Sequence, residues 1–171
     1  MINIAKKLII ILLLFNNCLS YDTIKITLIQ RVSQFIQWPE LNEKFIIGVY
    51  QNEKLKDEMI KLYKDKTIQK LPIEIYNIKD EKDKRIEKLN LIYFTKELSI
   101  EIDKVLEEIK KSPILVITEF PNDVYEGMHF GLYYENQRIK FIINQEAIEE
   151  AKLKASYKIL RLAKIVKTGK E

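Results

Sequence analysis

The spacing of hydrophobic side chains along this chain switches repeatedly between a helical period and a strand-like period. The clearest helical pattern follows Ser99 and places four apolar side chains on one face: Ile102, Val105, Leu106 and Ile109. The same reasoning predicts helices over residues 23–37, 144–152 and 157–166. It also predicts a helix that is capped by Asn52 and has four side chains at helical spacing: Leu55, Met59, Leu62 and Tyr63. The chain is therefore expected to be rich in amphipathic helices.

The first predicted helix begins after Asp22, a good capping residue, and ends before Pro39, which favours an extended conformation for Trp38. Helical spacing places five of its side chains on the face that we expect to be buried: Ile24, Leu28, Val32, Phe35 and Ile36.

Six short segments rich in β-branched and aromatic residues lie between the helices: residues 44–51, 72–78, 89–95, 114–118, 129–134 and 138–143. The run ILVIT at 114–118 is almost continuously apolar, which is typical of a strand buried on both faces. Residues 135–137 separate the last two strands and predict a hairpin turn. We therefore expect one α/β domain over residues 21–171, a layered sandwich around a mostly parallel central sheet with a C-terminal hairpin.

Composition and charge exclude several classes of function. The chain has 171 residues with a net charge of +4, and the two signs are interleaved rather than clustered, so we expect no nucleic-acid partner. A single cysteine and a single histidine exclude a disulfide framework, a zinc ribbon and any site that needs a histidine pair. The chain also lacks the G-x-S-x-G, P-loop and G-x-G-x-x-G patterns, so an enzyme is the least favoured class and we expect no cofactor.

Residues 1–20 have the order of a secretory signal peptide. Lys6 and Lys7 precede the apolar run 8–15, and small residues precede a cleavage site after Ser20. The run is too short for a spanning helix, although an uncleaved anchor stays an alternative, as does a lipoprotein acylated at Cys18. Cleavage after Ser20 would leave a periplasmic chain without cysteine.

Three carboxylates follow the most buried predicted strand. Glu119 ends that strand, where open α/β sheets bind ligands, and Asp123 and Glu126 come shortly after it. They are candidates for contact with a partner or ligand, and the ligand spacing of a calcium loop is absent. We therefore expect no metal, and solvated carboxylates are the alternative interpretation.

Other candidate residues have a structural reading beside a functional one. Trp38, the only tryptophan, either fills a gap in the core or anchors a partner. Asn144 is best explained as a helix cap and could also face a small ligand, whereas the lone His129 is expected to be structural. Arg161 belongs to a broad basic face that is expected either to meet an acidic partner or anionic lipid, or simply to be solvated: Lys158, Arg161, Lys164 and Lys167.

Four stretches together resemble one family. They are IKITLIQRVSQFIQWPE at 24–40, ILVITE at 114–119, EGMHFGL at 126–132 and FIINQEAIEEAKLKASYKILRLAKIV at 141–166. Their order and spacing are similar to those of the YfiR-like family of exported bacterial domains, and the resemblance spans nearly the whole chain after the leader.

The resemblance implies a flavodoxin-like or Rossmann-like domain in the periplasm. It also implies a non-enzymatic regulator in cyclic-di-GMP signalling, which binds the periplasmic sensor region of an inner-membrane diguanylate cyclase or histidine kinase and represses it. A homodimer is a further implication. Members of the family often carry cysteines whose disulfides matter for redox control, and this chain after cleavage has none, so such control does not apply to it.

Two other classes compete with the regulator. A periplasmic small-ligand sensor would use the strand ends near Glu119 and Asn144, and it is compatible with a regulatory role. A hydrolase or transferase on the same scaffold is the weakest, because no activated nucleophile is identifiable.

Overall fold

The computed structural model describes residues 21–95, 99–135 and 138–169. Eight strands in this part of the chain form one sheet: β2 (Phe45–Tyr50), β3 (Thr67–Ile68), β4 (Leu71–Ile78), β5 (Leu91–Phe94), β6 (Leu115–Thr118), β7 (Phe130–Glu135), β8 (Arg138–Asn144) and β10 (Ala163–Val166). Two further short strands pair with each other, β1 (Ile36–Gln37) and β9 (Lys154–Ala155). The helices are α2 (Tyr21–Ser33), α3 (Glu53–Tyr63), α4 (Ile100–Ile109), α5 (Pro121–Tyr125), α6 (Gln145–Glu150) and α7 (Tyr157–Leu160), with a 3-10 turn η1 (Ile86–Lys88).

The strand order across the sheet is β10-β8-β7-β6-β5-β2-β4-β3. The five strands from β4 to β7 run parallel to one another, which is the 2-1-3-4-5 order of flavodoxin-like folds. β8 runs antiparallel to β7 and forms the expected hairpin with it, while β10 is parallel to β8. These observations confirm an α/β fold with a mostly parallel central sheet. The order of the chain reverses between β2 and β5.

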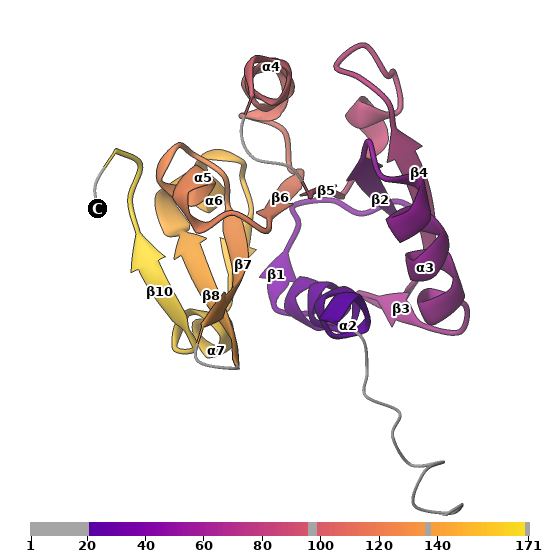
Figure 1. Cartoon of the computed structure of the whole chain (residues 1–171), viewed down its shortest axis with the longest axis horizontal. Coiled ribbons are helices and arrows are strands. Elements are labelled where there is room, and N and C mark those ends of the chain that lie inside the picture. The colour runs from indigo at the N-terminus through magenta and orange to yellow at the C-terminus, as the bar shows by residue number, and fades with distance from the viewer. Residues whose placement is uncertain (1–20, 96–98, 136–137, 170–171) are drawn as a thin grey trace, which may run out of the picture.

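Helices cover both faces of the sheet, and Figure 1 shows α2 and α4 on opposite sides of it. The larger core joins α2 and α3 to one face, through side chains such as Ile29, Met59 and Ile47. The smaller core joins α4 to the other face, through Val105, Ile92 and Val116. The apolar run of β6 is buried throughout, as expected for a central strand between two helical layers.

The first helix differs from the expectation in its length and in its buried face. It ends at Ser33, Phe35 lies half-buried in the following turn, and Asp22 lies inside the first turn rather than at the cap. Ile24 is exposed and Leu28 is half-buried, whereas the buried residues are Lys25, Ile26, Ile29, Val32 and Ser33. A lysine counts as a surface residue in a hydrophobicity pattern, and here a carboxylate partner allows it to be buried, which turns the buried face of the helix.

The predicted helix over residues 157–166 is wrong. Only the single turn α7 is helical, and the chain then enters strand β10, which pairs with β8 from Ala163↔Phe141 to Val166↔Asn144. The edge of β8 offers backbone hydrogen bonds that a helix would leave unused, and Ile165 and Val166 are β-branched. Tertiary pairing therefore overrides the helical spacing.

Candidate functional site

Glu119 stands at the carboxyl end of β6 and is the centre of a polar cluster between α2 and the sheet. Lys25 Nζ lies 2.7 Å from Glu119 Oε2 and 3.0 Å from Asp22 Oδ1. The hydroxyl of Tyr93, on β5, donates to Glu119 Oε1 at 2.7 Å. We call these four residues, Asp22, Lys25, Tyr93 and Glu119, the Glu119 cluster. It holds α2 against the carboxyl ends of β5 and β6.

The charges of the Glu119 cluster are fixed by its own members. Burial by itself lowers the pKa of Lys25, but hydrogen bonds and charges from Glu119 and Asp22 raise that pKa above its ordinary value. Burial and the neighbouring Glu119 carboxylate raise the pKa of Tyr93 far above its usual range. Lys25 is therefore a protonated ion-pair partner and not a nucleophile, and Tyr93 is a neutral hydrogen-bond donor.

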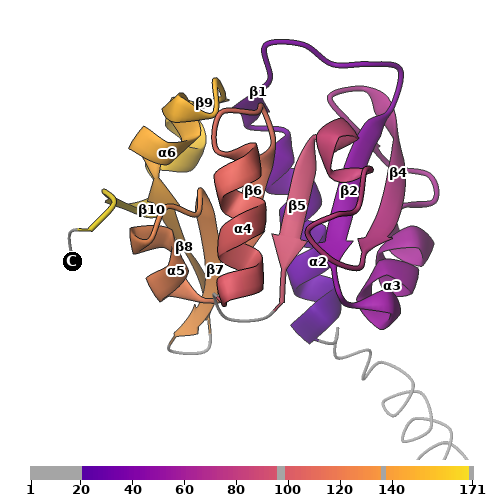
Figure 2. The ribbon, with the colours of Figure 1, turned by 90° about the horizontal axis from the view of Figure 1, so that it is seen from above.

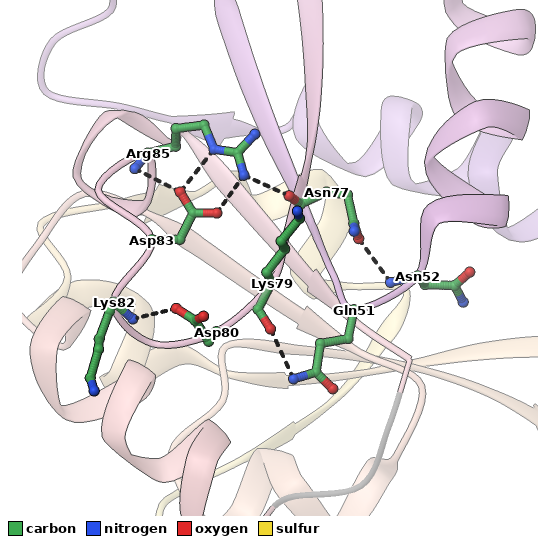
Figure 3. Close-up of polar contacts among 8 residues, drawn as sticks. All are labelled: Gln51, Asn52, Asn77, Lys79, Asp80, Lys82, Asp83 and Arg85. Carbon is green, nitrogen blue, oxygen red and sulfur yellow. Dashed lines mark hydrogen bonds and ion pairs between the residues drawn. The ribbon is translucent and has the colours of Figure 1, made fainter.

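A second polar cluster lies at the carboxyl ends of β2 and β4 (Figure 3). The backbone N–H of Asn52 donates to Asn77 Oδ1 at 2.9 Å, and Gln51 Nε2 donates to the carbonyl of Lys79 at 3.0 Å. Asn52 Oδ1 caps α3 by accepting from the N–H of Leu55 at 3.0 Å, as expected from the sequence.

The charged connector after β4 folds back on the same strand ends, as Figure 3 shows. Arg85 Nη2 donates to the carbonyl of Asn77 at 3.0 Å, and Arg85 Nε donates to Asp83 Oδ1 at 2.8 Å. The Arg85 side chain lowers the pKa of Asp83 to about 2. These groups satisfy one another, so the cluster orders the connector.

The three carboxylates expected near one strand end are not brought together. Glu119 is in its cluster, Asp123 is buried in α5 where it accepts from Thr118 Oγ1 at 3.1 Å, and Glu126 is exposed just after α5. Gly127 follows with a φ of +110°, a backbone conformation that glycine adopts readily. Among the residues with described positions, no group of three or more His, Cys, Asp or Glu side chains could hold a metal ion.

Asn144 ends β8 and is fully buried. Its Oδ1 accepts from the N–H of Ala147 at 3.0 Å, which confirms the expected helix cap. Its Nδ2 donates to the carbonyl of Val124 at 3.1 Å and to Thr168 Oγ1 at 2.9 Å. The side chain is thus used to join α6, α5 and the C-terminal segment.

Trp38 lies at the opposite edge of the sheet, before the amino ends of β2 and β5. Its Nε1–H donates to the carbonyl of Asn90 at 3.1 Å, and its ring meets Phe45 edge-to-face with centroids 5.0 Å apart. The side chain is half-buried against the larger core. These contacts agree with the structural reading of Trp38, and whether a partner also touches it stays a prediction.

The basic residues near the C-terminus lie on α7, on β10 and in the segments next to them, rather than along one helix. The guanidinium of Arg161 stacks over the exposed ring of Tyr157, 5.7 Å from its centroid. Lys164 lies over Tyr125, and Lys167 pairs with Glu146. The face therefore combines positive charge with exposed apolar surface.

Lys25 and Tyr93 are the residues of the Glu119 cluster that the sequence did not indicate. Lys25 sits between two isoleucines in an amphipathic helix, and Tyr93 sits inside an apolar strand. Asp22 lies three residues before Lys25, but the shared partner Glu119 lies 94 residues from Lys25 and 26 from Tyr93, so no local pattern indicates the cluster.

Comparison with known proteins places the chain in a family. No curated protein matches the sequence. Residues 1–20, which carry the expected signal peptide, lie outside the described residues, and no helix among those described is long and apolar enough to cross a membrane. A family model described as YfiR/HmsC-like matches residues 22–164. Because the match covers most of its length, the chain belongs to the YfiR/HmsC-like family.

Proposed function

We propose that this protein is a non-enzymatic periplasmic regulator that binds an inner-membrane signalling protein, a diguanylate cyclase or a sensor histidine kinase, and represses it. The observation that carries the proposal is the family match over residues 22–164. The polar clusters at the strand ends support it, because their groups are engaged with one another and offer no activated nucleophile.

The surface that we assign to the partner is the β10 face, defined as Tyr157, Lys158, Arg161, Leu162 and Ile165. Three of these side chains are apolar and strongly exposed: Tyr157 at 73%, Leu162 at 69% and Ile165 at 44%. Large apolar side chains gathered in one exposed place are typical of interaction sites, and aromatic and arginine side chains are frequent among the residues that dominate binding.

Charge and strand geometry define the kind of partner. Lys158 and Arg161 are exposed among the apolar side chains, so an acidic surface on the sensor region complements them. Among the described strands β10 is also an edge strand with β8 as its one neighbour, so its outer backbone edge can accept an added strand. We expect the periplasmic part of the partner to present an acidic rim around an apolar or extended segment.

The test is affinity capture of the tagged, exported protein from detergent-solubilised envelope, with partners identified by mass spectrometry. Enrichment of one inner-membrane protein with a cyclase or kinase output domain is expected, and Leu162→Asp should abolish it. Ile100→Asp is the matched control, since Ile100 is 77% exposed on α4, outside the β10 face. If a folded bait captures no such protein, the proposed function is contradicted. If both variants capture the partner equally, the assigned face is wrong.

Repression gives a second readout. Cells that carry Leu162→Asp in place of the native protein should show raised cyclic-di-GMP or raised kinase output, whereas cells with Ile100→Asp should not.

A further inference from the structure

A pocket of about 160 Å³ lies between α4, the segment after α5, and α6, away from the carboxyl ends of β5 and β6. Figure 2 shows α4 crossing the sheet beside α5 and α6. Val116 and His129 line the pocket on the sheet side, and Ile109 and Ala147 contribute apolar wall from the two helices. A volume of this size suits a molecule of a few non-hydrogen atoms and is too small for a nucleotide.

His129 is 96% buried, and its tautomer follows from its hydrogen bond. The backbone N–H of Val116 donates to His129 Nδ1 at 3.1 Å, so Nδ1 carries no proton. Burial lowers the pKa of His129 to about 4, so the ring is neutral at pH 7 and its proton is on Nε2.

The Nε2–H of His129 is a donor without a protein acceptor among the described residues, because Val116 is the only hydrogen-bond partner of the ring there. Since the imidazole lines the pocket, an oxygen acceptor inside the pocket is the natural partner of this group. The ring thus supplies a neutral donor at the inner wall.

Negative charge surrounds the mouth. Glu107, Glu126 and Glu150 line the pocket and are exposed, and within the described chain none of them forms an ion pair. Lys110 is the one basic side chain among the lining residues, and the carboxyl end of α4 adds partial negative charge. The mouth therefore favours a cation and disfavours a carboxylate.

We propose that this pocket binds a small primary amine that also carries a neutral oxygen acceptor. The oxygen accepts from His129 Nε2–H at the inner wall, and the ammonium group lies among Glu107, Glu126 and Glu150 at the mouth. The site is separate from the β10 face, and the inference does not rest on the proposed function.

The only histidine in the chain makes the test direct. Long-range ¹H–¹⁵N NMR of the exported protein is expected to show Nε2 protonated and Nδ1 unprotonated. Titration with ethanolamine should then shift the Nε2–H signal in a saturable way. The expected Kd is on the order of 1 mM, because four non-hydrogen atoms limit the affinity. Propylamine, which keeps the charge and lacks the oxygen, and 1-propanol, which lacks the charge, should each bind at least about fivefold more weakly because each loses one of the two polar contacts.

Glu→Gln variants test whether the carboxylates at the mouth of the pocket contribute to binding. Glu126→Gln should weaken ethanolamine binding about two- to threefold, and Glu126→Gln with Glu150→Gln about fivefold, since exposed charges contribute modestly. Glu108→Gln is the matched control, because Glu108 is exposed on α4 and does not line the pocket. Four results would each overturn the proposal. Two concern the ring and ethanolamine: a proton on Nδ1, or no saturable shift up to 50-fold above the expected Kd (about 50 mM). The other two are equal binding of propylamine and an effect of Glu108→Gln as large as that of Glu126→Gln.

Discussion

The Glu119 cluster and the His129 pocket both place ionisable groups in the interior, but they differ in how those groups are satisfied. In the Glu119 cluster, Lys25 contacts two carboxylates and Tyr93 donates to one of them. In the pocket, His129 uses Nδ1 internally, while its Nε2–H faces a space lined by carboxylates. The first arrangement is complete without a ligand, and the second offers a donor and negative charge to one.

The difference between the two regions affects where a ligand site is expected in this fold. Ligands of flavodoxin-like sheets bind at the carboxyl ends of the strands, and the sequence directed attention there through Glu119. In this protein those groups are engaged with α2 and with the connector after β4, so they stabilise the fold. Two features use other parts of the molecule, the β10 face and the His129 pocket, and the pocket lies near the amino ends of β6 and β7.

The largest expected effect comes from breaking the Glu119 cluster. Lys25→Met leaves the Glu119 carboxylate without its cation, and we expect the free energy of unfolding to fall by about 3 kcal/mol, measured by urea denaturation. Adding Glu119→Gln should restore part of the loss, because the amide oxygen still accepts from Tyr93 and the carboxylate that remains without Lys25, Asp22, is partly exposed to solvent. Lys56→Met, which breaks a surface ion pair, is the control and should have little effect. A loss no greater than in the control would mean that the cluster does not clamp α2.

The pH dependence of the free energy of unfolding tests the burial of His129 in the pocket. The pKa of His129 is about 4 in the folded state and near 6.5 when unfolded, so between these values the unfolded chain binds more protons. Stability is therefore lost as pH falls, by about 2 kcal/mol between pH 7 and pH 5. Denaturation curves at the two pH values measure it, and His129→Gln should flatten the difference.

The low pKa of Asp83, about 2, affects stability only below about pH 4, outside this window. An equally steep loss between pH 7 and pH 5 in His129→Gln would show that the histidine is not the group responsible.

A smaller effect is expected for Tyr93→Phe, which removes one donor from Glu119 and leaves Lys25 in place. The free energy of unfolding should fall by about 1 kcal/mol in chemical denaturation. Tyr157→Phe is the control, since the Tyr157 side chain is exposed and should tolerate the change. If Tyr93→Phe is as harmless as the control, the hydroxyl is not part of the clamp.

The smallest effect on stability is expected at the mouth of the pocket. Glu126→Gln should change the free energy of unfolding by no more than about 0.5 kcal/mol, since the side chain is exposed. Thermal denaturation without ligand is the measurement. A large loss would assign Glu126 to the fold, as Glu119 is, and would remove the contrast between the two regions.

Much of the fold could be predicted from the sequence where local signals and tertiary structure agree. Asn52, Ser99 and Asn144 cap the helices that follow them, and the apolar run of β6 is central and buried. The prediction failed at residues 157–166, where the free edge of β8 decides the conformation. It also failed for the buried face of α2, where Glu119 allows Lys25 to be buried.

The candidate site was predicted less well, for a related reason. Glu119, Asp123 and Glu126 are close in sequence, but the turn of α5 sends one into a cluster, one into the interior and one to the surface. The roles of Trp38 and Arg161 in partner binding remain predictions, because contacts within one chain do not identify a partner.

The sequence by itself determined the family, the alternation of helices and strands, the cap residues and the absence of cysteine after the expected leader, since each depends on residues near one another in the chain or on their order. Only the tertiary structure decided which polar groups are satisfied and which are left facing a cavity. Hydrogen bonds and ion pairs join residues such as Lys25 and Glu119 that are 94 positions apart, and no local pattern encodes such a pairing.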